Sequence, residues 1–132
     1  MSGLMQFDLV SPEAALVSME IMSVEIPGAE GDFTAMPQHA PLITSLRPGF
    51  LKVNSNDGTK EYVVTGGFVE INATSTSVLA EQAFDRKNIT KDIIDELVDD
   101  AEKALANCAE DSRDSLEKRL YDTKSLLDFL DL

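Results

Sequence analysis

Apolar and polar residues alternate with a period of two along the first part of the chain. In segment 17–26, the apolar residues Met22, Val24 and Ile26 are separated by single polar residues, which is typical of a strand with one buried face. Further segments with strand character are 6–10, 32–35, 42–46, 50–54, 60–65, 68–72 and 77–80. Short strands spaced about 8–12 residues apart, with turns between them, predict a β-sandwich or a closed β-barrel.

The clearest turn signal is the sequence S-N-D-G at residues 55–58. Asn56 and Asp57 tolerate left-handed backbone angles, and Gly58 accepts a positive φ at no steric cost. The turn therefore predicts a β-hairpin that joins strands 50–54 and 60–65.

The hydrophobic period changes to three and four in the last third of the chain, as expected for helices with one apolar face. The first apolar stripe is Ile94, Leu97, Ala101, Ala104, Leu105 and Cys108, and the second is Leu116, Leu120, Thr123, Leu127 and Leu130. Candidate caps are Asn88 or Thr90 for the first helix and Asp111 or Ser112 for the second. The pattern predicts two antiparallel helices joined by a short connection.

A change of composition separates the two patterns. The last proline is Pro48 and the last glycine is Gly67, so the helical pattern contains neither of the residues that most disfavour a helix. Residues 88–132 carry 13 acidic and 6 basic side chains, a net charge of −7. We predict an α+β chain with a β domain over residues 1–87 and an α-helical hairpin over residues 88–132.

Composition and charge limit the classes of partner. With 43% hydrophobic residues, the 132-residue chain can bury a core, and its net charge of −13 argues against binding to nucleic acid or directly to anionic lipid. The N-terminus lacks the pattern of a signal peptide, and no apolar run approaches the roughly 20 residues that a transmembrane helix needs. We expect a cytosolic protein.

The residues that catalysis would need are missing. His39 is the only histidine, and the only cysteine, Cys108, lies on an apolar helix stripe, where a small buried hydrophobe is the simpler interpretation. Gly66-Gly67 lacks the spacing and the lysine of a phosphate-binding loop. The acids of segment 92–102 are spread around a helix and lack the turn glycine of a calcium loop. We predict no catalytic residues, no metal site and no cofactor.

The segment from Pro27 to Gly49 is the candidate binding region. It holds four of the five prolines, three of the seven glycines and the only histidine, so it is a shaped excursion between extended elements. Loops of this kind, held on a rigid scaffold, are common binding sites. Between Pro37 and Pro41, His39 either shapes the loop or contacts a partner, and the residues alone leave both alternatives open.

Six short motifs, in order along the chain, match one protein family. They are Leu9-Val10-Ser11-Pro12-Glu13, Pro27-Gly28-Ala29-Glu30-Gly31-Asp32-Phe33, Met36-Pro37-Gln38-His39-Ala40-Pro41-Leu42, Arg47-Pro48-Gly49, Thr65-Gly66-Gly67-Phe68-Val69-Glu70 and Val78-Leu79-Ala80-Glu81. With them the chain resembles the epsilon subunit of bacterial F-type ATP synthases, which is equivalent to the mitochondrial delta subunit. Each motif alone is weak, and their shared order and spacing carry the resemblance.

The resemblance implies a ten-stranded β-sandwich followed by a two-helix hairpin. It also implies a non-catalytic subunit of the central stalk, which links the gamma subunit to the membrane c-ring and couples ion-driven rotation to ATP synthesis. Such a subunit lies at the cytoplasmic face of the bacterial inner membrane. The alternative is a free-standing β-sandwich that binds a ligand or has a regulatory role outside the motor.

The resemblance also implies site residues. Asp32 matches the family's acidic residue in the loop that faces the c-ring, and His39 matches the histidine before A-P-L. Glu30, Gly31 and Gln38 are assigned to the same loop. An acidic loop that meets basic c-ring loops would set the register of the contact more than its affinity.

The helical segment departs from the family in two respects. Some relatives bind ATP through the motif I/L-D-x-x-R-A, but Ile94-Asp95 is followed by Val98-Asp99 without the arginine, so we predict no nucleotide site. Contact with the catalytic β subunits would use basic residues of the second helix, namely Arg113, Lys118, Arg119 and Lys124. Because the segment has a net charge of −7 and the facing surface in the family is acidic, we expect little or no inhibition of ATP hydrolysis.

Overall fold

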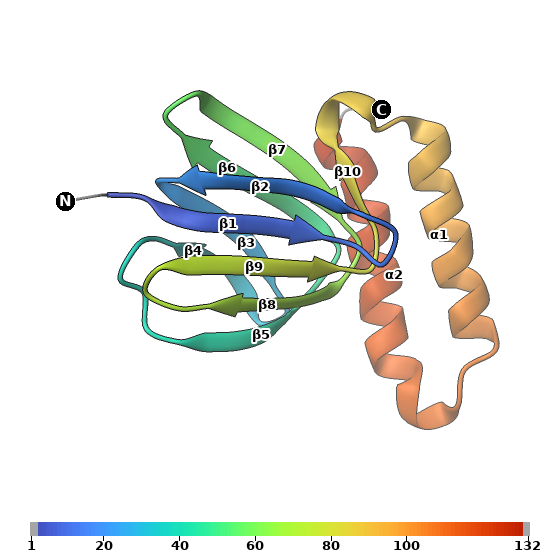
Figure 1. Cartoon of the computed structure of the whole chain (residues 1–132). Helices are drawn as coiled ribbons and strands as arrows, with labels where there is room; N and C mark the ends of the chain where they lie inside the picture. Colours follow the sequence, from blue (N-terminus) through green and yellow to red (C-terminus); the bar gives the residue numbers. More distant parts are fainter. Residues whose placement is uncertain (1–2, 131–132) are drawn as a thin grey trace. The chain divides into compact units, whose positions relative to one another are not determined.

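The computed structural model describes residues 3–130, apart from the side chain of Phe129. The chain divides into two compact units, with the boundary between Arg86 and Lys87, and each unit is described separately. The first unit contains all ten strands of the described chain and the second contains its two α-helices. The ten-stranded β-sandwich and the helical pair are therefore confirmed (Figure 1).

The strands form one continuous sheet that curls into a sandwich (Figure 1). They are β1 (Met5–Val10), β2 (Ala15–Ile21), β3 (Ser23–Gly28), β4 (Gly31–Ala35), β5 (Leu42–Leu46), β6 (Gly49–Ser55), β7 (Gly58–Val64), β8 (Gly67–Ile71), β9 (Ser75–Ala80) and β10 (Ala83–Asp85). Their order is β10-β7-β6-β3-β5-β8-β9-β1-β2, and β4 pairs with β3 outside this path. Most neighbours are antiparallel, but β1 and β9 run parallel.

The core lies between the two layers of the curled sheet. Met5, Phe7 and Leu9 alternate on β1 and are fully buried, as the period of two requires. Tyr62 of β7 also lies in this core. Burial raises the pKa of its hydroxyl, and the nearby negative charge of Asp85 raises it further.

The prediction of a single strand over residues 17–26 is wrong. The chain bends at Met22, which is exposed, and this bend separates β2 from β3. The Met22 N–H donates to the carbonyl oxygen of Asn54 (2.7 Å), and β3 then pairs with β6. The alternating segment 17–26 thus contributes a strand to each layer of the sandwich, because the bend allows each half to bury its own apolar side chains.

Glycine is required at two places in the sandwich, a hairpin turn and a close approach of two strands. In the β6–β7 hairpin, Ser55 and Gly58 are register partners and Gly58 has a φ of 115°, which confirms the predicted turn. Gly67 begins β8 with a φ of 127°, and a Cβ at this position would lie 2.0 Å from the Leu79 carbonyl oxygen. The β8 and β9 backbones therefore approach each other more closely than any side chain at residue 67 would allow.

The second unit is a helical hairpin. Helix α1 (Lys91–Ala106) begins at Thr90, whose hydroxyl accepts a hydrogen bond from the Ile93 N–H (3.3 Å). A 3₁₀ turn, η1 (Arg86–Asn88), precedes it. A second 3₁₀ turn, η2 (Glu110–Ser112), leads into helix α2 (Arg113–Leu130), so both residues predicted to cap α2 lie within that turn.

The buried residues of the hairpin differ in part from the two predicted apolar stripes. Ile94 and Leu97 of α1 are buried as predicted, whereas Ala104 is exposed. On α2, Leu126 is the fully buried leucine, although the predicted stripe did not include it. Leu126 lies three residues after the buried Thr123, so it shares the same helix face.

Candidate functional site

The five residues assigned to a c-ring contact do not lie in one loop, so the prediction of a single loop is wrong, while the c-ring contact stays a prediction. Strand β4 separates the β3–β4 turn, which holds Glu30 and Gly31, from the β4–β5 loop, which holds Gln38 and His39. A strand rises about 3.3 Å per residue, so the five residues of β4 place the two turns roughly 15 Å apart along the strand. Figure 1 shows the β4–β5 loop beside the β8–β9 turn, at one end of the sandwich.

The β3–β4 turn is tight and glycine-rich. Gly28 and Gly31 are register partners, and Gly31 has a φ of 146°. A Cβ on Gly28 would lie 2.7 Å from the Gly31 carbonyl oxygen, so the turn cannot close with a larger residue there. Glu30 occupies the exposed tip, and Asp32 follows on β4 in an ion pair with Arg47.

The β4–β5 loop begins with a turn at Met36–His39. The His39 N–H donates to the Met36 carbonyl oxygen (3.2 Å), and Gln38 has a φ of 73°. A positive φ at the third position, after proline at the second, is the geometry of a type II turn, which favours glycine. Because the Gln38 N–H also donates to the Ala73 carbonyl oxygen (2.8 Å), the loop is fixed to the β8–β9 turn.

This strained position gives a direct test of the loop geometry. Gln38→Val should lower the free energy of unfolding by about 1–2 kcal/mol, because a β-branched residue resists a positive φ more than glutamine does. Urea denaturation followed by circular dichroism measures the change. Gln38→Gly is the matched control and should not destabilise the protein, since glycine adopts this angle without steric cost. Equal losses of stability in Gln38→Val and Gln38→Gly would show that the positive φ at position 38 does not strain the backbone.

His39 uses one ring nitrogen inside the loop. Its Nδ1 lies 2.6 Å from the Ala40 carbonyl oxygen, and a carbonyl oxygen can only accept, so Nδ1 carries the hydrogen and donates. In the neutral ring Nε2 is then an acceptor, suited to an N–H or O–H donor on a partner. The structure thus shows a loop-shaping role for His39, and contact with a partner remains a prediction.

The outer face of β8, β9, β1 and β2 carries a row of apolar residues. Phe68 and Leu79 are register partners, Leu79 pairs with Val10, and Val10 pairs with Ala15. We call these four residues the outward apolar row. Phe68 is 57% exposed and Leu79 51% exposed, although both occupy strands whose other face is buried. Neighbouring exposed apolar side chains of this size are typical of a surface that a partner covers.

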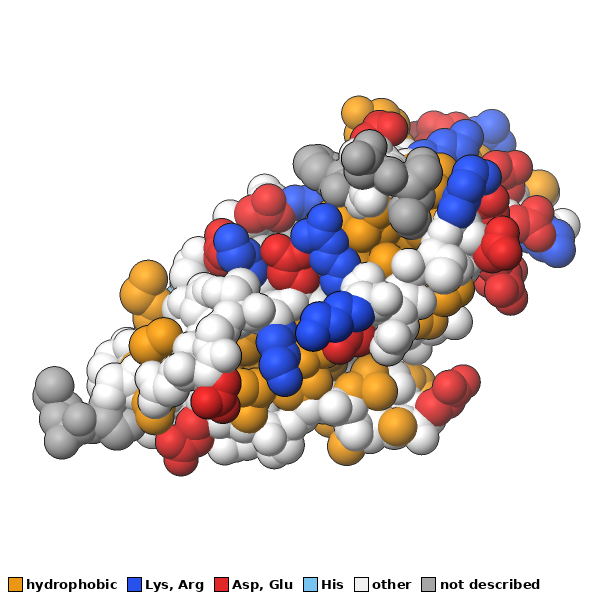
Figure 2. All heavy atoms as spheres, turned by 90° about the horizontal axis from the view of Figure 1, so that it is seen from above, with side chains coloured by type: hydrophobic (Ala, Val, Ile, Leu, Met, Phe, Trp, Pro, Cys, Tyr) orange, Lys and Arg blue, Asp and Glu red, His pale blue; other side chains and the backbone are white. Residues whose placement is uncertain are grey.

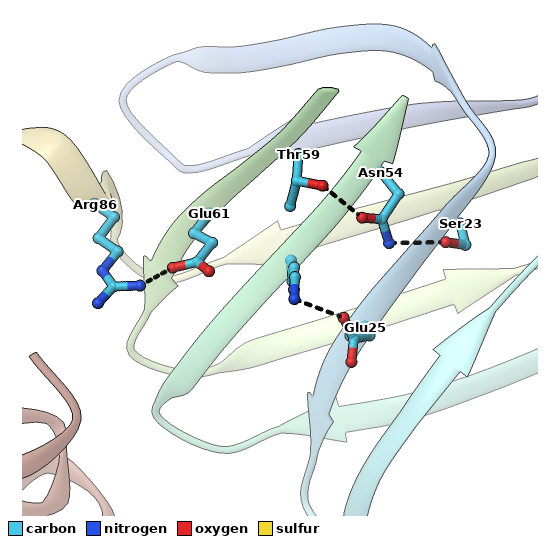
Figure 3. Close-up of polar contacts among 7 residues, drawn as sticks. Ser23, Glu25, Asn54, Thr59, Glu61 and Arg86 are labelled. Carbon is cyan, nitrogen blue, oxygen red and sulfur yellow. Dashed lines mark hydrogen bonds and ion pairs between the residues drawn. The ribbon is translucent and has the colours of Figure 1, made fainter. Parts of the chain in front are cut away.

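The outer face of β3, β6 and β7 is polar at residues 23–25, 52–54 and 59–61, where side chains bind one another, and the register partners Phe50 and Val63 continue the same face as an apolar pair. The Asn54 amide donates to the Ser23 hydroxyl (2.9 Å), while its oxygen accepts from Thr59 (2.9 Å), so three strands are joined (Figure 3). The Lys52 Nζ lies 3.9 Å from the Glu25 carboxylate. Figure 2 shows acidic and basic side chains intermingled on the surface seen from above.

A further ion pair continues this polar face. Glu61 of β7 pairs with Arg86, whose guanidinium also lies over the Phe50 ring, 5.7 Å from its centre. Glu25, Lys52 and Glu61 are successive register partners, so charges of opposite sign alternate across the strands. The contrast with the outward apolar row points to the β8–β9–β1–β2 face as the docking face of the sandwich.

The cations of the helical hairpin are largely held by acids of the same helix. The Asp95 carboxylate accepts a hydrogen bond from Lys91 and raises the pKa of that amine, and Asp99 does the same for Lys103. On α2, Arg113 pairs with Glu117 (3.0 Å). Helix α1 carries six acidic and two basic side chains, so these pairs leave it with an excess of negative charge.

The basic residues predicted to contact the catalytic head differ in their surroundings. Lys118 and Arg119 each have interaction partners within the chain; Arg119 is half-buried, and Lys118 and Lys124 are exposed. Across the described residues 3–130, no group of three or more histidine, cysteine or acidic side chains is arranged to hold a metal ion. Within the same range, neither helix has the length and apolarity needed to cross a membrane.

Comparisons with known proteins identify the class of protein. Residues 4–86 match the family described as ATP synthase, Delta/Epsilon chain, beta-sandwich domain. The ATP synthase epsilon chain of Ruegeria sp. (strain TM1040) is 53% identical over 112 residues, which cover 85% of this chain and 82% of the relative. That of Jannaschia sp. (strain CCS1) is 48% identical over 124 residues, or 94% of each chain.

Solved structures share the fold. A chain of the Euglena gracilis mitochondrial ATP synthase, in a structure described as OSCP/F1/c-ring in rotational state 1, superposes with a TM-score of 0.74 at 20% identity and covers 98% of this chain and 83% of that one. A chain of the Tetrahymena thermophila mitochondrial ATP synthase, in a structure described as central stalk/c-ring, gives a TM-score of 0.58 at 20% identity over 67% of this chain and 71% of that one. At this identity the two likenesses concern the fold alone.

The epsilon-chain relatives, which match most of this chain, define its class as a non-catalytic subunit of the ATP synthase complex. The chain belongs to the ATP synthase delta/epsilon family and is an epsilon-type chain, as the sequence motifs implied.

Sequence reasoning missed the outward apolar row and the Arg47–Asp32 pair. A signal for the row was present, because Phe68-Val69 and Val78-Leu79 are adjacent apolar residues. Neighbours in a strand point to opposite faces, so one residue of each pair has to face outward. No local signal marks the Arg47–Asp32 pair, whose members are 15 residues apart.

Proposed function

We propose that this chain is the central-stalk subunit that joins the gamma subunit to the c-ring and transmits ion-driven rotation to the catalytic head of an ATP synthase. It acts at the cytoplasmic face of the bacterial inner membrane, as a peripheral part of the complex. Family membership over nearly the whole chain carries the proposal. The structures with the same fold come from ATP synthases described with a c-ring and, in one case, a central stalk.

The outward apolar row supports a contact with gamma. Phe68 and Leu79 offer an exposed aromatic and an exposed aliphatic side chain on a rigid sheet, and burial of such apolar side chains by a partner stabilises a complex. The polar face on the opposite layer has internal partners for its charges and offers no comparable anchors. A rotor contact that transmits torque needs such a firm, non-polar attachment.

The c-ring contact would use the two turns at the ends of β4. Glu30 and Gly31 of the β3–β4 turn, with Asp32 next to them on β4, suit basic c-ring loops, because opposite charges fix the register of a contact. Gln38 and His39 would form a second contact with the rotor at the other end of β4. His39 suits a hydrogen-bond donor there, since its Nδ1 already donates within the loop.

Co-purification tests the proposal directly. The tagged full chain, co-expressed with the gamma subunit and c-ring of the same ATP synthase, should retain both through detergent extraction and size-exclusion chromatography. Failure to retain gamma would refute the rotor function. It would instead favour the alternative, a free-standing ligand-binding or regulatory β-sandwich.

Deletion of the helical hairpin tests regulation. A chain that ends at Lys87 should support ATP synthesis close to the full-length level, with little rise in ATP hydrolysis, because the net charge of −7 on the hairpin disfavours insertion against an acidic surface. Both rates are measured in membrane vesicles. A large rise in hydrolysis would show that the hairpin inhibits the catalytic head, and Arg113, Lys118, Arg119 and Lys124 would then be the candidate contacts with the catalytic β subunits.

A further inference from the structure

The side chain of Arg47 fastens both strands of the β3–β4 turn. Its Nε–H donates to the Gly28 carbonyl oxygen on β3 (3.1 Å), and its Nη2 pairs with the Asp32 carboxylate on β4. The backbone N–H of Arg47 also donates to the Pro27 carbonyl oxygen (3.0 Å). A planar guanidinium presents several donors in fixed directions, so a single residue can hold both sides of the turn in register.

Apart from the β3–β4 pairing, which ends at Gly28 and Gly31, few further contacts hold the turn. Glycine at positions 28 and 31 gives its backbone more freedom than any other residue would. Between them, the Ala29 N–H donates to the Ser45 carbonyl oxygen (2.9 Å), which again ties the turn to β5. The position of Glu30 at the tip therefore depends on contacts with the end of β5 and, through both strands, on Arg47.

Arg47 also determines which negative charge near the turn is available to a partner. The Asp32 side chain is 74% exposed, yet its carboxylate is paired with Arg47, whose side chain is only 27% exposed. Glu30 is exposed and forms no ion pair among the described residues. The uncompensated charge of the turn is thus that of Glu30, two residues before the acid that the family pattern singled out.

We propose that Arg47 is the positioning residue of the β3–β4 turn, that Glu30 is its contact anion, and that Asp32 serves mainly to hold Arg47. The partner is a cationic loop of the c-ring, so the inference rests on the proposed rotor function. Electrostatics and positioning make opposite predictions for the loss of Arg47. Without this cation the turn becomes more negative, which should tighten binding to a cationic loop, whereas loss of positioning should weaken it.

Binding of the full-length chain to detergent-solubilised gamma–c-ring complex tests this by surface plasmon resonance. We expect Glu30→Gln to weaken binding about tenfold, Arg47→Gln about fivefold, and Asp32→Asn less than Glu30→Gln. Arg47→Lys, which keeps the charge but not the forked donors, should also weaken binding. Lys52→Gln is the matched control: it removes one cation from an exposed ion pair on the polar face and should leave binding unchanged.

A structural readout separates positioning from a general loss of stability. In Arg47→Gln the Ala29 amide should exchange with solvent faster, while core amides such as that of Phe7 keep their wild-type protection. Equal or tighter binding by Arg47→Gln, or a larger effect of Asp32→Asn than of Glu30→Gln, would overturn the inference. If Arg47→Gln does not fold, the binding measured for Arg47→Lys and Glu30→Gln tests the inference without it. If the wild-type chain fails to bind the rotor, the proposed function itself is refuted.

Discussion

Replacement of Gly67 by alanine should destabilise the β-sandwich by about 4 kcal/mol or more, a large part of the stability of a typical single domain. A Cβ at this position would lie 2.0 Å from the Leu79 carbonyl oxygen and 3.0 Å from the Ala80 Cα, both of which are backbone atoms that cannot rotate away. The φ of 127° adds strain of its own. Denaturation by urea, followed by circular dichroism, measures the loss.

Gly58→Ala is the matched control. Gly58 has a similar φ of 115°, but a Cβ there would meet nothing within 4 Å. This variant should therefore lose only the cost of the backbone angle, about 1–3 kcal/mol. If both variants lost the same stability, the close approach of β8 and β9 would not be the reason for glycine at position 67.

The second large effect concerns attachment to the gamma subunit. Replacement of both Phe68 and Leu79 by serine should weaken binding to gamma about 100-fold, which corresponds to about 2.7 kcal/mol. The two side chains are register partners at the centre of the outward apolar row, and both are exposed in the free chain. Titration calorimetry with purified gamma measures the change in affinity.

The stability of this double variant should change by no more than about 1 kcal/mol, since an exposed cross-strand pair contributes little to folding. Met22→Ser is the control. Met22 is also an exposed apolar residue of the sandwich, at 43%, but it lies at the bend between β2 and β3 and outside the row. A similar loss of affinity in Met22→Ser would show a general effect of surface polarity. Unchanged affinity in the double variant would remove the row from the gamma contact.

Local patterns in the sequence predicted most elements of the fold. The period of two located eight strand segments, and the helical period located both helices, because burial of one face imposes these repeats on the residues themselves. Gly58 marked its turn, and Thr90, one of two candidates, is the cap of α1. Strand β10 has only three residues and was not found, since so short a segment shows no period.

The candidate site was predicted less completely, although the sequence contained enough information to separate Glu30 from Gln38. The segment 32–35 was a strand candidate inside the presumed loop, and the length of such a strand already separates Glu30 from Gln38. The role of Asp32 could not be predicted from the sequence, because its partner Arg47 lies 15 residues away, directly after the end of β5. An ion pair between residues far apart in the chain depends on how strands are ordered in the sheet.

The sequence by itself determined the type and place of the elements, the absence of the usual catalytic residue combinations, and the family. These features depend on short-range periodicity, on residue identity and on ordered motifs. Only the tertiary structure decided that the chain changes layer at Met22, that Phe68 and Leu79 rather than Val69 and Val78 face outward, and that Arg47 holds the β3–β4 turn. Alternation shows which residues of a strand share a face, but the pairing of distant strands decides which face is buried and which side chains meet.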